Sequence, residues 1–276
     1  MFELKKGALY VVATPIGNLA DLSPRARDVL AQADLICAED TRHTRHMLNA
    51  LGLERPLLAL HEHNEAERVQ QILEQLQSGK SLALVSDAGT PLISDPGYRL
   101  VRGLRAAGVS ISPIPGPCAA IAALSVAGIA SDRFCFEGFL PHKASARRER
   151  LHRLTNEPRT LVFYESAHRI EECLVDLVAA FGPERDAVLA REISKLFETV
   201  LDGGLGVIAE QVAADPNQRR GEFVLVVAGA PEDESAALSE GRRLYAKLSE
   251  VMKPSQAAKI AADLSGAPRK ALYGGE

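Results

Sequence analysis

The sequence lacks the marks of several large classes of protein. No apolar run approaches the roughly 18 residues of a membrane-spanning helix, and residues 1–6 lack the apolar core of a signal peptide. The four cysteines are scattered without a Cys-x-x-Cys spacing, so each is expected to be a small buried side chain. These absences predict a cytoplasmic protein with neither a disulfide framework nor a cysteine-based metal site.

Two common nucleotide-binding loops are also missing. The loop at residues 14–18 follows an apolar run, but it has neither Gly-x-Gly-x-x-Gly spacing nor a following Gly-Lys-Ser/Thr. A nicotinamide enzyme and a P-loop NTPase are therefore not expected. The one metal-like pattern, His61-Glu62-His63, has no further ligands at a matching spacing, so no metal is expected either.

Charge and length set broad limits. A formal net charge of −4 argues against a protein that coats nucleic acid through bulk charge, although it leaves room for a local basic patch. The length of 276 residues and a hydrophobic fraction of 46% suit one large or two medium globular domains.

Strands and helices alternate along the chain, which predicts an α/β fold with a largely parallel sheet. The pattern restarts at residues 128–133, where a helix of small residues ends and a new strand begins. We therefore predict an N-terminal α/β domain over residues 1–130 and a second over residues 131–231. A helical tail follows over residues 235–276, either as a small helix-turn-helix or as an arm packed on the main body.

The most informative segment is Ser86–Gly97, a glycine-rich loop directly after the buried strand at residues 82–85. Most connections between a strand and a helix run two to six residues, whereas this one holds two Ser-Asp-x-Gly turns. A glycine-rich loop at the carboxyl end of a strand is the usual ligand crevice of an open α/β sheet. We expect it to bind a ligand.

A basic segment follows the predicted domain boundary. Residues 141–153 contain five Lys or Arg residues and one acidic residue. Such a run is most often a solvated helix face, but here it would border the interdomain cleft, where a polyanion can be held.

Seven motifs identify a family. In chain order they are Val12–Leu19, Ala38–Arg42, Ser86–Gly97, Pro115–Pro117, Gly138–Lys143, Tyr164–Arg169 and Arg191–Lys195. Over residues 7–230 they resemble the branch of the tetrapyrrole-methylase superfamily that methylates ribosomal RNA, and the helical tail resembles that of the same branch. Ala167 is a small departure, since the family usually has proline there.

The resemblance implies two αβα domains with S-adenosylmethionine in the cleft between them. It also implies 2′-O-methylation of a cytidine ribose in the decoding region of 16S rRNA, in the small ribosomal subunit. A homodimer is expected from the superfamily and from the small-residue surface at residues 119–127. The cofactor-binding residues that the resemblance implies are Gly89, Thr90, Pro91, Ile93, Ala119, Ala120, Tyr164, Val227 and Ala228.

Methyl transfer to a ribose hydroxyl chiefly requires alignment of oxygen, methyl and sulfur, and a base can assist as the proton leaves. The candidates for that base are Asp87, Glu39 and Glu165, each at or beyond the end of a predicted strand. The sequence does not choose among them, and an acid there could instead hold the ribose or offset the sulfonium charge.

The RNA-binding candidates are the cations of the basic segment and two that follow the second strand: Arg42, Arg45, Lys143, Arg147, Arg148, Arg150 and Arg153. Two other functions stay open. One is a methyltransferase acting on tetrapyrroles or other small molecules, against which the basic segment and the tail argue. The other is a non-catalytic RNA-binding module, against which the intact glycine loop argues.

Overall fold

The computed structural model describes residues 3–61, 63–231 and 234–272. The chain forms two compact units, residues 1–229 and residues 230–276. Within the described residues, every helix is too short or too polar to span a membrane. The larger unit contains two five-stranded sheets, and the smaller unit is helical.

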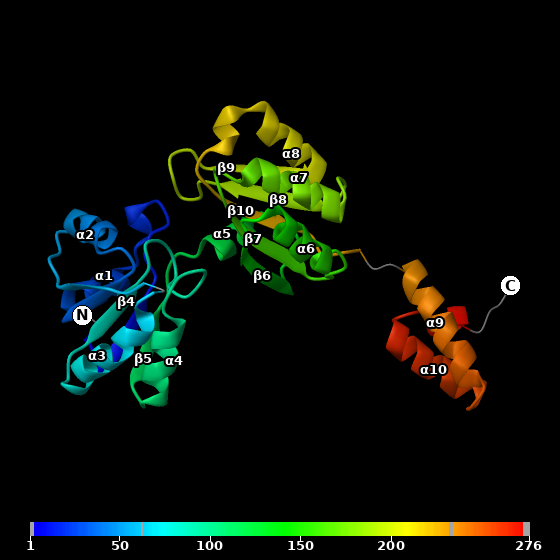
Figure 1. Ribbon diagram of the computed structural model, residues 1–276, viewed down its shortest axis with the longest axis horizontal. Coiled ribbons are helices and arrows are strands. Elements are labelled where there is room, and N and C mark those ends of the chain that lie inside the picture. The colour runs from blue at the N-terminus through cyan, green and yellow to red at the C-terminus, as the bar shows by residue number, and fades with distance from the viewer. Residues whose placement is uncertain (1–2, 62, 232–233, 273–276) are drawn as a thin grey trace. The chain divides into compact units, whose positions relative to one another are not determined.

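The first sheet is wholly parallel, as the alternation of strands and helices predicts. Its strand order is β3-β2-β4-β1-β5, and every neighbouring pair is parallel. The strands are β1 (Ala8–Val12), β2 (Leu35–Ala38), β3 (Leu57–Ala59), β4 (Leu82–Val85) and β5 (Ser110–Ile114). Because all five point the same way, the loops that follow them meet at one edge of the sheet (Figure 1).

Helices cover both faces of this sheet. Side chains of β4 alternate between the faces: Ala83 and Val85 pack with α1 (Pro24–Gln32) and α2 (Thr41–Ala50). Leu82 and Leu84 pack with α3 (Glu65–Gln77) and α4 (Tyr98–Ala106). A short 3₁₀ helix, η1 (Leu19–Asp21), precedes α1.

The start of α1 follows the predicted capping pattern. The Ser23 hydroxyl oxygen accepts a hydrogen bond from the Ala26 amide at 3.1 Å, and Pro24 is the first helical residue.

The second sheet departs from the expected parallel arrangement. Its order is β6-β7-β10-β8-β9, and only β6 and β7 are parallel. Its strands are β6 (Phe134–Phe139), β7 (Thr160–Ser166), β8 (Asp186–Arg191), β9 (Thr199–Gly204) and β10 (Glu222–Val227). The connection from β8 to β9 is too short to hold a crossover helix, so the chain turns back and pairs antiparallel.

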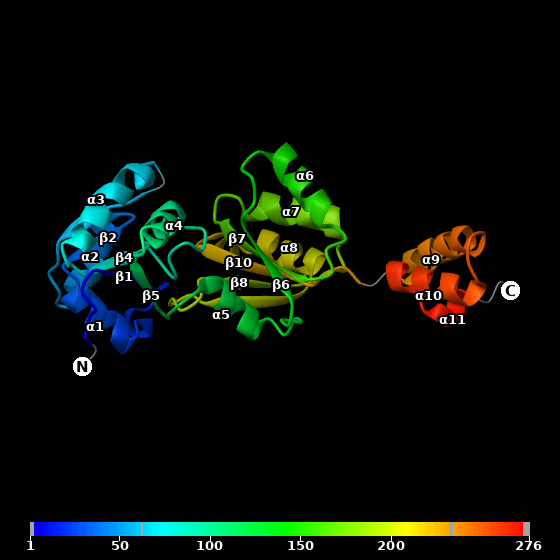
Figure 2. The same cartoon turned by 90° about the horizontal axis from the view of Figure 1, so that it is seen from below.

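Helices also cover both faces of the second sheet (Figure 2). One face packs against α6 (Ala144–Leu154), α7 (Ile170–Phe181) and α8 (Leu205–Ala214), which leads into the 3₁₀ helix η2 (Pro216–Arg219). The other face packs against α5 (Ala119–Val126). Because α5 precedes the predicted boundary yet packs on the second sheet, the packing favours a boundary before this helix, near residues 115–118.

The smaller unit has its own core. It consists of α9 (Glu234–Ser249), α10 (Pro254–Ser265) and the short α11 (Arg269–Leu272). Ala261, Ala267 and Leu272 are buried in it, and Leu244 and Leu248 pack around them. Gly266 ends α10 in the left-handed conformation, at φ 75°, which lets the chain turn towards α11.

Candidate active site

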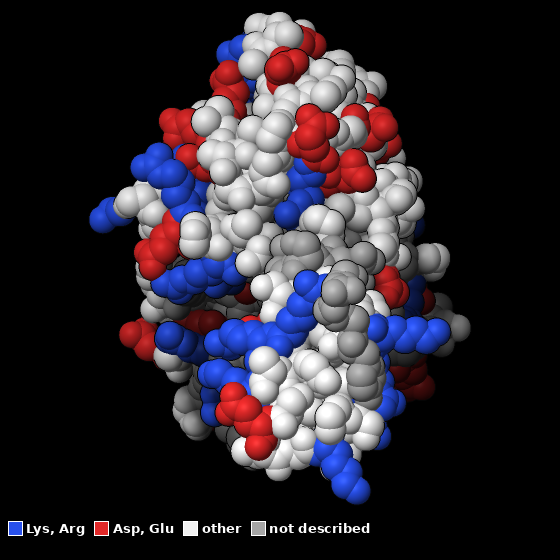
Figure 3. Space-filling view, turned by 90° about the vertical axis from the view of Figure 1, so that its right-hand side faces the viewer, with Lys and Arg blue, Asp and Glu red and all other residues white. Residues whose placement is uncertain are grey.

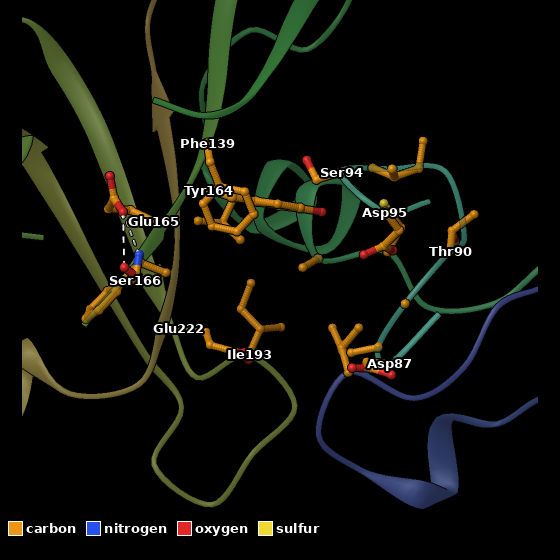
Figure 4. Close-up of a pocket in the computed structure, with 18 of the residues that line it drawn as sticks. Asp87, Thr90, Ser94, Asp95, Phe139, Tyr164, Glu165, Ser166, Ile193 and Glu222 are labelled. Carbon is orange, nitrogen blue, oxygen red and sulfur yellow. Dashed lines mark hydrogen bonds between the residues drawn. The ribbon is translucent and has the colours of Figure 1, made fainter. Parts of the chain in front are cut away.

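A cavity of about 430 Å³ lies within the larger unit, between the two sheets. Residues 87–90 and 93–95 line it from the loop after β4, and Glu39 lines it from the end of β2. The second sheet contributes the ends of β6 and β7, the start of β10 and the loop after β8. The predicted glycine loop therefore borders a cavity at the carboxyl edge of the first sheet (Figure 4).

The glycine loop is anchored to two other segments of the chain at the end of its first turn. Gly89 and Thr14 exchange two backbone hydrogen bonds, of 2.8 and 3.1 Å. The Thr90 hydroxyl donates to the Pro117 carbonyl oxygen at 2.9 Å. Gly89 has φ 80°, and a Cβ there would lie 3.3 Å from Cγ2 of Ile16. Position 89 therefore requires glycine for its backbone conformation and leaves little space for a side chain.

The remainder of this loop is strained. Leu92 and Ser94 have φ of 74° and 67°, a conformation that residues other than glycine rarely adopt. Ser94 and Asp95 both face the pocket. Backbone strain of this kind costs on the order of 1–3 kcal/mol per residue and persists where the surroundings enforce it, most often at functional sites.

Three carboxylates, those of Glu39, Asp87 and Asp95, line the side of the pocket that the first sheet forms. Asp87 Oδ1 accepts a hydrogen bond from the Asp40 amide at 3.0 Å. Burial and the nearby charge of Asp87 raise the pKa of Glu39. Burial, together with the charges of Glu39 and Asp87, raises the pKa of Asp95 to about 7. Asp95 is not among the site residues predicted from the sequence; the signal that indicates it is the second Ser-Asp-x-Gly turn of the loop.

Glu165, the third proposed base, is held by strong donors. Its Oε2 accepts from Arg169 at 2.8 Å, and its Oε1 accepts from the Ser166 amide at 2.8 Å. Arg169 also donates to the Leu140 carbonyl and contacts the ring of His142. Both oxygens of Glu165 are engaged, which favours a positioning role over proton transfer.

Tyr164 links the pocket to the start of α5. Its hydroxyl oxygen accepts a hydrogen bond from the Ala120 amide at 3.1 Å, and burial raises the pKa of the phenol above its usual value. Its ring packs edge-on against Phe136 and Phe139, with centroid distances of 4.9 and 5.6 Å. Phe139 is 53% exposed and lines the cavity, so it offers an aromatic surface at the opening.

The loop after β8 forms the opposite wall and touches the first half of the unit. Lys195 Nζ donates to Glu192 and Glu222, both at 2.8 Å, and Ser194 hydrogen-bonds to Asp21. A Cβ on Gly17 would lie 2.3 Å from Cγ of Lys195, so the two segments meet closely. Glu192 and Ser194 also have positive φ, of 52° and 70°. A second strained loop thus borders the pocket.

The structure separates the residues predicted to bind the cofactor into three groups. Gly89, Thr90, Ile93, Ala119 and Tyr164 line the cavity. Pro91 and Ala120 are buried, and each is adjacent in sequence to a residue that lines the cavity. Val227 and Ala228 do not belong to its lining.

The prediction for Val227 and Ala228 is corrected by the direction of β10. This strand runs antiparallel to β7, so its first residues, Glu222–Val224, reach the pocket instead of its last. Val227 is fully buried in the core beneath α6–α8. The sequence does not show which way a strand runs, so it does not show which end of β10 reaches the pocket.

The predicted RNA-binding cations differ in their exposure to solvent. Arg147 is 2% exposed and paired with Asp176 at 2.7 Å, so its assignment to RNA contact is wrong: it faces the core side of α6. Arg42, Arg45, Lys143, Arg148, Arg150 and Arg153 are exposed. Among these, Arg42, Arg148, Arg150 and Arg153 pair with acids. Figure 3 shows that the face it presents carries both signs of charge, as the mixed composition implies.

No group of three or more potential metal ligands gathers anywhere in the described part of the chain. The rings of His61 and His63 are 6.1 Å apart, and Glu62 between them lies outside the described residues.

Two family models match this sequence. Residues 8–209 match the model of the tetrapyrrole (corrin/porphyrin) methylases, and residues 235–274 match that of the RsmI C-terminal HTH domain. The second match corresponds to the helical unit and bears on the helix-turn-helix alternative for the tail.

Curated relatives match over nearly the whole chain. Three proteins named ribosomal RNA small subunit methyltransferase I illustrate this. The one from Xylella fastidiosa is 63% identical, with 98% of each chain covered. The one from Pseudomonas aeruginosa is 52% identical, over 98% of this chain and 96% of the relative. The one from Escherichia coli O157:H7 is 50% identical, over 97% and 94%.

Solved structures share the fold. The methyltransferase CobJ matches with a TM-score of 0.60 and 22% identity, over 81% of this chain and 95% of that one. A uroporphyrin-III C-methyltransferase from Thermus thermophilus, complexed with S-adenosylhomocysteine, matches with a TM-score of 0.55 and 18% identity, over 80% and 97%. At these identities the likeness establishes the two-sheet architecture alone.

Proposed function

Because this chain belongs to the tetrapyrrole methylase family and, within it, to the group of ribosomal RNA small subunit methyltransferase I, we propose that it methylates the 2′-oxygen of a cytidine ribose in 16S rRNA. The methyl donor is S-adenosylmethionine. The observation that carries this function is the near full-length identity of up to 63% to proteins of that name, which extends through the helical unit.

The pocket fits S-adenosylmethionine on three counts. Its volume of about 430 Å³ falls within the roughly 300–1,000 Å³ of small-molecule sites. Glu39, Asp87 and Asp95 place negative charge on one wall, where it can offset a sulfonium and an ammonium. The backbone around Gly89 comes close to the cavity because no side chain intervenes.

The residues of this chain mainly position and shield the reactants. When bound, the cofactor supplies a methyl group on a sulfonium, which is already an excellent leaving group. Tyr164 stays neutral and shapes the apolar wall, and Glu165 is fixed by Arg169 at 2.8 Å. Alignment of two bound reactants can remove several kcal/mol from a barrier, so a rigid pocket of this kind provides much of the catalysis.

Three cations that follow pocket-lining residues along the chain can bind the phosphates of the RNA substrate. Arg42 and Arg45 lie on α2, which begins two residues after Glu39. Lys143 precedes α6 and follows Phe139 by four residues. All three cations are exposed. Such contacts bind phosphates and set the register of the RNA without reading its sequence.

Three finer proposals accompany this function. We infer that the substrate is presented within the small ribosomal subunit, and that the protein acts in the cytoplasm where ribosomes are modified. We also infer a homodimer. The outer face of α5 supports it, since Ile121 and Val126 are 52% and 59% exposed while the opposite face packs on the second sheet.

Transfer of labelled methyl groups to purified 30S subunits tests the function. The expected product is one 2′-O-methylcytidine per subunit, found by nuclease digestion and mass spectrometry. A tetrapyrrole substrate assayed in parallel should accept no label. Label in the tetrapyrrole and none in the 30S subunit would favour the small-molecule enzyme. A protein that binds 30S subunits but not S-adenosylmethionine would favour the non-catalytic module.

A further inference from the structure

Phe139 is a large aromatic side chain that the fold leaves open at the pocket. It ends β6, lines the cavity and is 53% exposed, whereas its neighbours Gly138 and Leu140 are buried. In Figure 4 Phe139 and Tyr164 lie together, across the pocket from Asp87. The ring therefore belongs to the aromatic wall of the second sheet, opposite the acidic wall of the first.

An irregularity in strand pairing directs the Phe139 ring to this wall. The register of β6 against β7 shifts by one residue between Phe136 and Gly138. Because side chains alternate between the two faces of a strand, Phe139 would otherwise lie on the face opposite to Phe136. The shift puts both rings on one face, where each packs edge-on against Tyr164. Gly138 permits it with φ 62°, a conformation that glycine adopts readily.

The backbone on both sides of Phe139 is held in place. A Cβ on Gly138 would lie 3.0 Å from Oγ of Ser94, so β6 passes close to the glycine loop. The Leu140 carbonyl oxygen accepts a hydrogen bond from Arg169 Nη2 at 2.7 Å. The ring is thus positioned before a ligand arrives, which lowers the entropic cost of binding to it.

A half-exposed ring at the opening suits a flat group that enters from solvent. The first wall carries Glu39, Asp87 and Asp95, whose charges suit the cations of S-adenosylmethionine, whereas Phe139 offers an uncharged aromatic surface. An RNA substrate enters from solvent and brings a flat base together with the ribose to be methylated. Proteins commonly hold an unstacked base of single-stranded RNA by stacking it on an aromatic side chain.

Resting on the function proposed above, we propose that Phe139 is the stacking platform for the base of the target cytidine. Stacking on this ring holds the attached ribose at the opening of the cofactor pocket. Every base has an aromatic face, so the contact positions the nucleotide without selecting cytosine. Loss of the ring therefore impairs use of the RNA and leaves cofactor binding intact.

The test replaces Phe139 by leucine, which keeps an apolar side chain but has no aromatic face. For Phe139→Leu we expect kcat/KM for 30S subunits to fall by about 5- to 150-fold, the effect of losing one stacked base. Phe139→Tyr keeps the ring and should retain kcat/KM within about threefold of the wild type. Affinity of both variants for S-adenosylmethionine, measured by calorimetry, should be that of the wild type. Phe134→Leu is the matched control, because Phe134 lies in the same strand, is 39% exposed and does not line the pocket.

Tryptophan fluorescence gives a readout that does not depend on activity. The chain contains no tryptophan, so Phe139→Trp introduces a single indole. Its emission should be quenched when 30S subunits are added in the presence of S-adenosylhomocysteine, because the indole then stacks on a base. Phe134→Trp should show no quenching, and the wild type supplies the background emission of the ribosomal proteins.

Four outcomes would overturn the inference. Phe139→Leu could keep more than half of the wild-type kcat/KM, or the indole of Phe139→Trp could remain unquenched. Phe139→Tyr could lose as much activity as Phe139→Leu, which would mean that the position serves packing alone. Cofactor affinity could fall in step with activity, which would assign the ring to the cofactor. A wild-type protein that leaves 30S subunits unmethylated would instead refute the proposed function.

Discussion

Arg147 Nε donates a hydrogen bond to Asp176 Oδ2 at 2.7 Å, and the two side chains are only 2% and 9% exposed. This buried pair joins α6 to α7 on the core side of the second sheet. Its neighbour Arg148 is 62% exposed, so consecutive arginines of the basic segment have opposite surroundings.

The first prediction concerns this pair. Arg147→Ala removes the buried partner of Asp176 and leaves only Arg148, whose Nη1 lies 3.7 Å from Asp176 Oδ1; breaking a buried ion pair typically costs about 3–5 kcal/mol. Urea unfolding followed by circular dichroism should show this loss. Arg148→Ala, as the control, should change the free energy of unfolding by less than about 1 kcal/mol. Equal stability of the two variants would contradict the structural role of Arg147.

The second prediction concerns the glycine loop. Gly89→Val forces a β-branched residue into φ 80° and places its Cβ 3.3 Å from Ile16, so S-adenosylmethionine binding should be lost in calorimetry. Gly79→Val is the matched control, because Gly79 has φ 89° and no atom within 4 Å of its Cβ position. It bears the same backbone strain and should bind the cofactor normally. Unchanged affinity in Gly89→Val would remove the loop from the cofactor site.

The third prediction concerns RNA. The double variant Lys143→Ala/Arg148→Ala should weaken binding to 30S subunits and flatten its dependence on log[salt] by roughly 1–2 units, because each phosphate contact contributes about 0.7–0.9. Affinity for S-adenosylmethionine should not change. The control variant Lys80→Ala/Arg105→Ala removes two exposed cations that do not line the pocket. Lys80 precedes β4, and Arg105 lies in the last turn of α4. This variant should leave the salt slope as it is. An unaltered slope in the first variant would mean that α6 is merely solvated.

The fourth prediction concerns stability and pH. Because the pKa of Asp95 is raised to about 7 in the folded protein, the folded state binds a proton more tightly than the unfolded state does. Its contribution to stability is therefore present at low pH and is lost as pH rises through about 7. Asp95→Asn removes this loss, so the difference in Tm between variant and wild type should move in favour of the variant from pH 5 to pH 8. A difference that stays constant with pH would show that Asp95 titrates normally.

Much of the architecture could be predicted from the chain alone. The parallel first sheet follows from alternating apolar runs and amphipathic helices, and the Ser23-Pro24 pair marks the start of α1 by its own chemistry. The loop at Ser86–Gly97 could be singled out because its turns are encoded by neighbouring residues. These features depend on local sequence, and the structure agrees with them.

Other features depend on contacts between distant residues, and only the tertiary structure decided them. The direction of β10 brings Glu222 rather than Val227 to the pocket, because it pairs antiparallel with β7, more than 50 residues earlier in the chain. Arg147 turns inward because Asp176, on the next helix, supplies a buried partner. The pKa of Asp95 rises chiefly because folding buries its carboxyl group, and also because Glu39, from the end of β2, and Asp87, from the same loop, add like charge. The sequence alone determined most of the elements and the family, while folding determined the environment of each side chain, since charge, burial and pairing arise only when those elements meet.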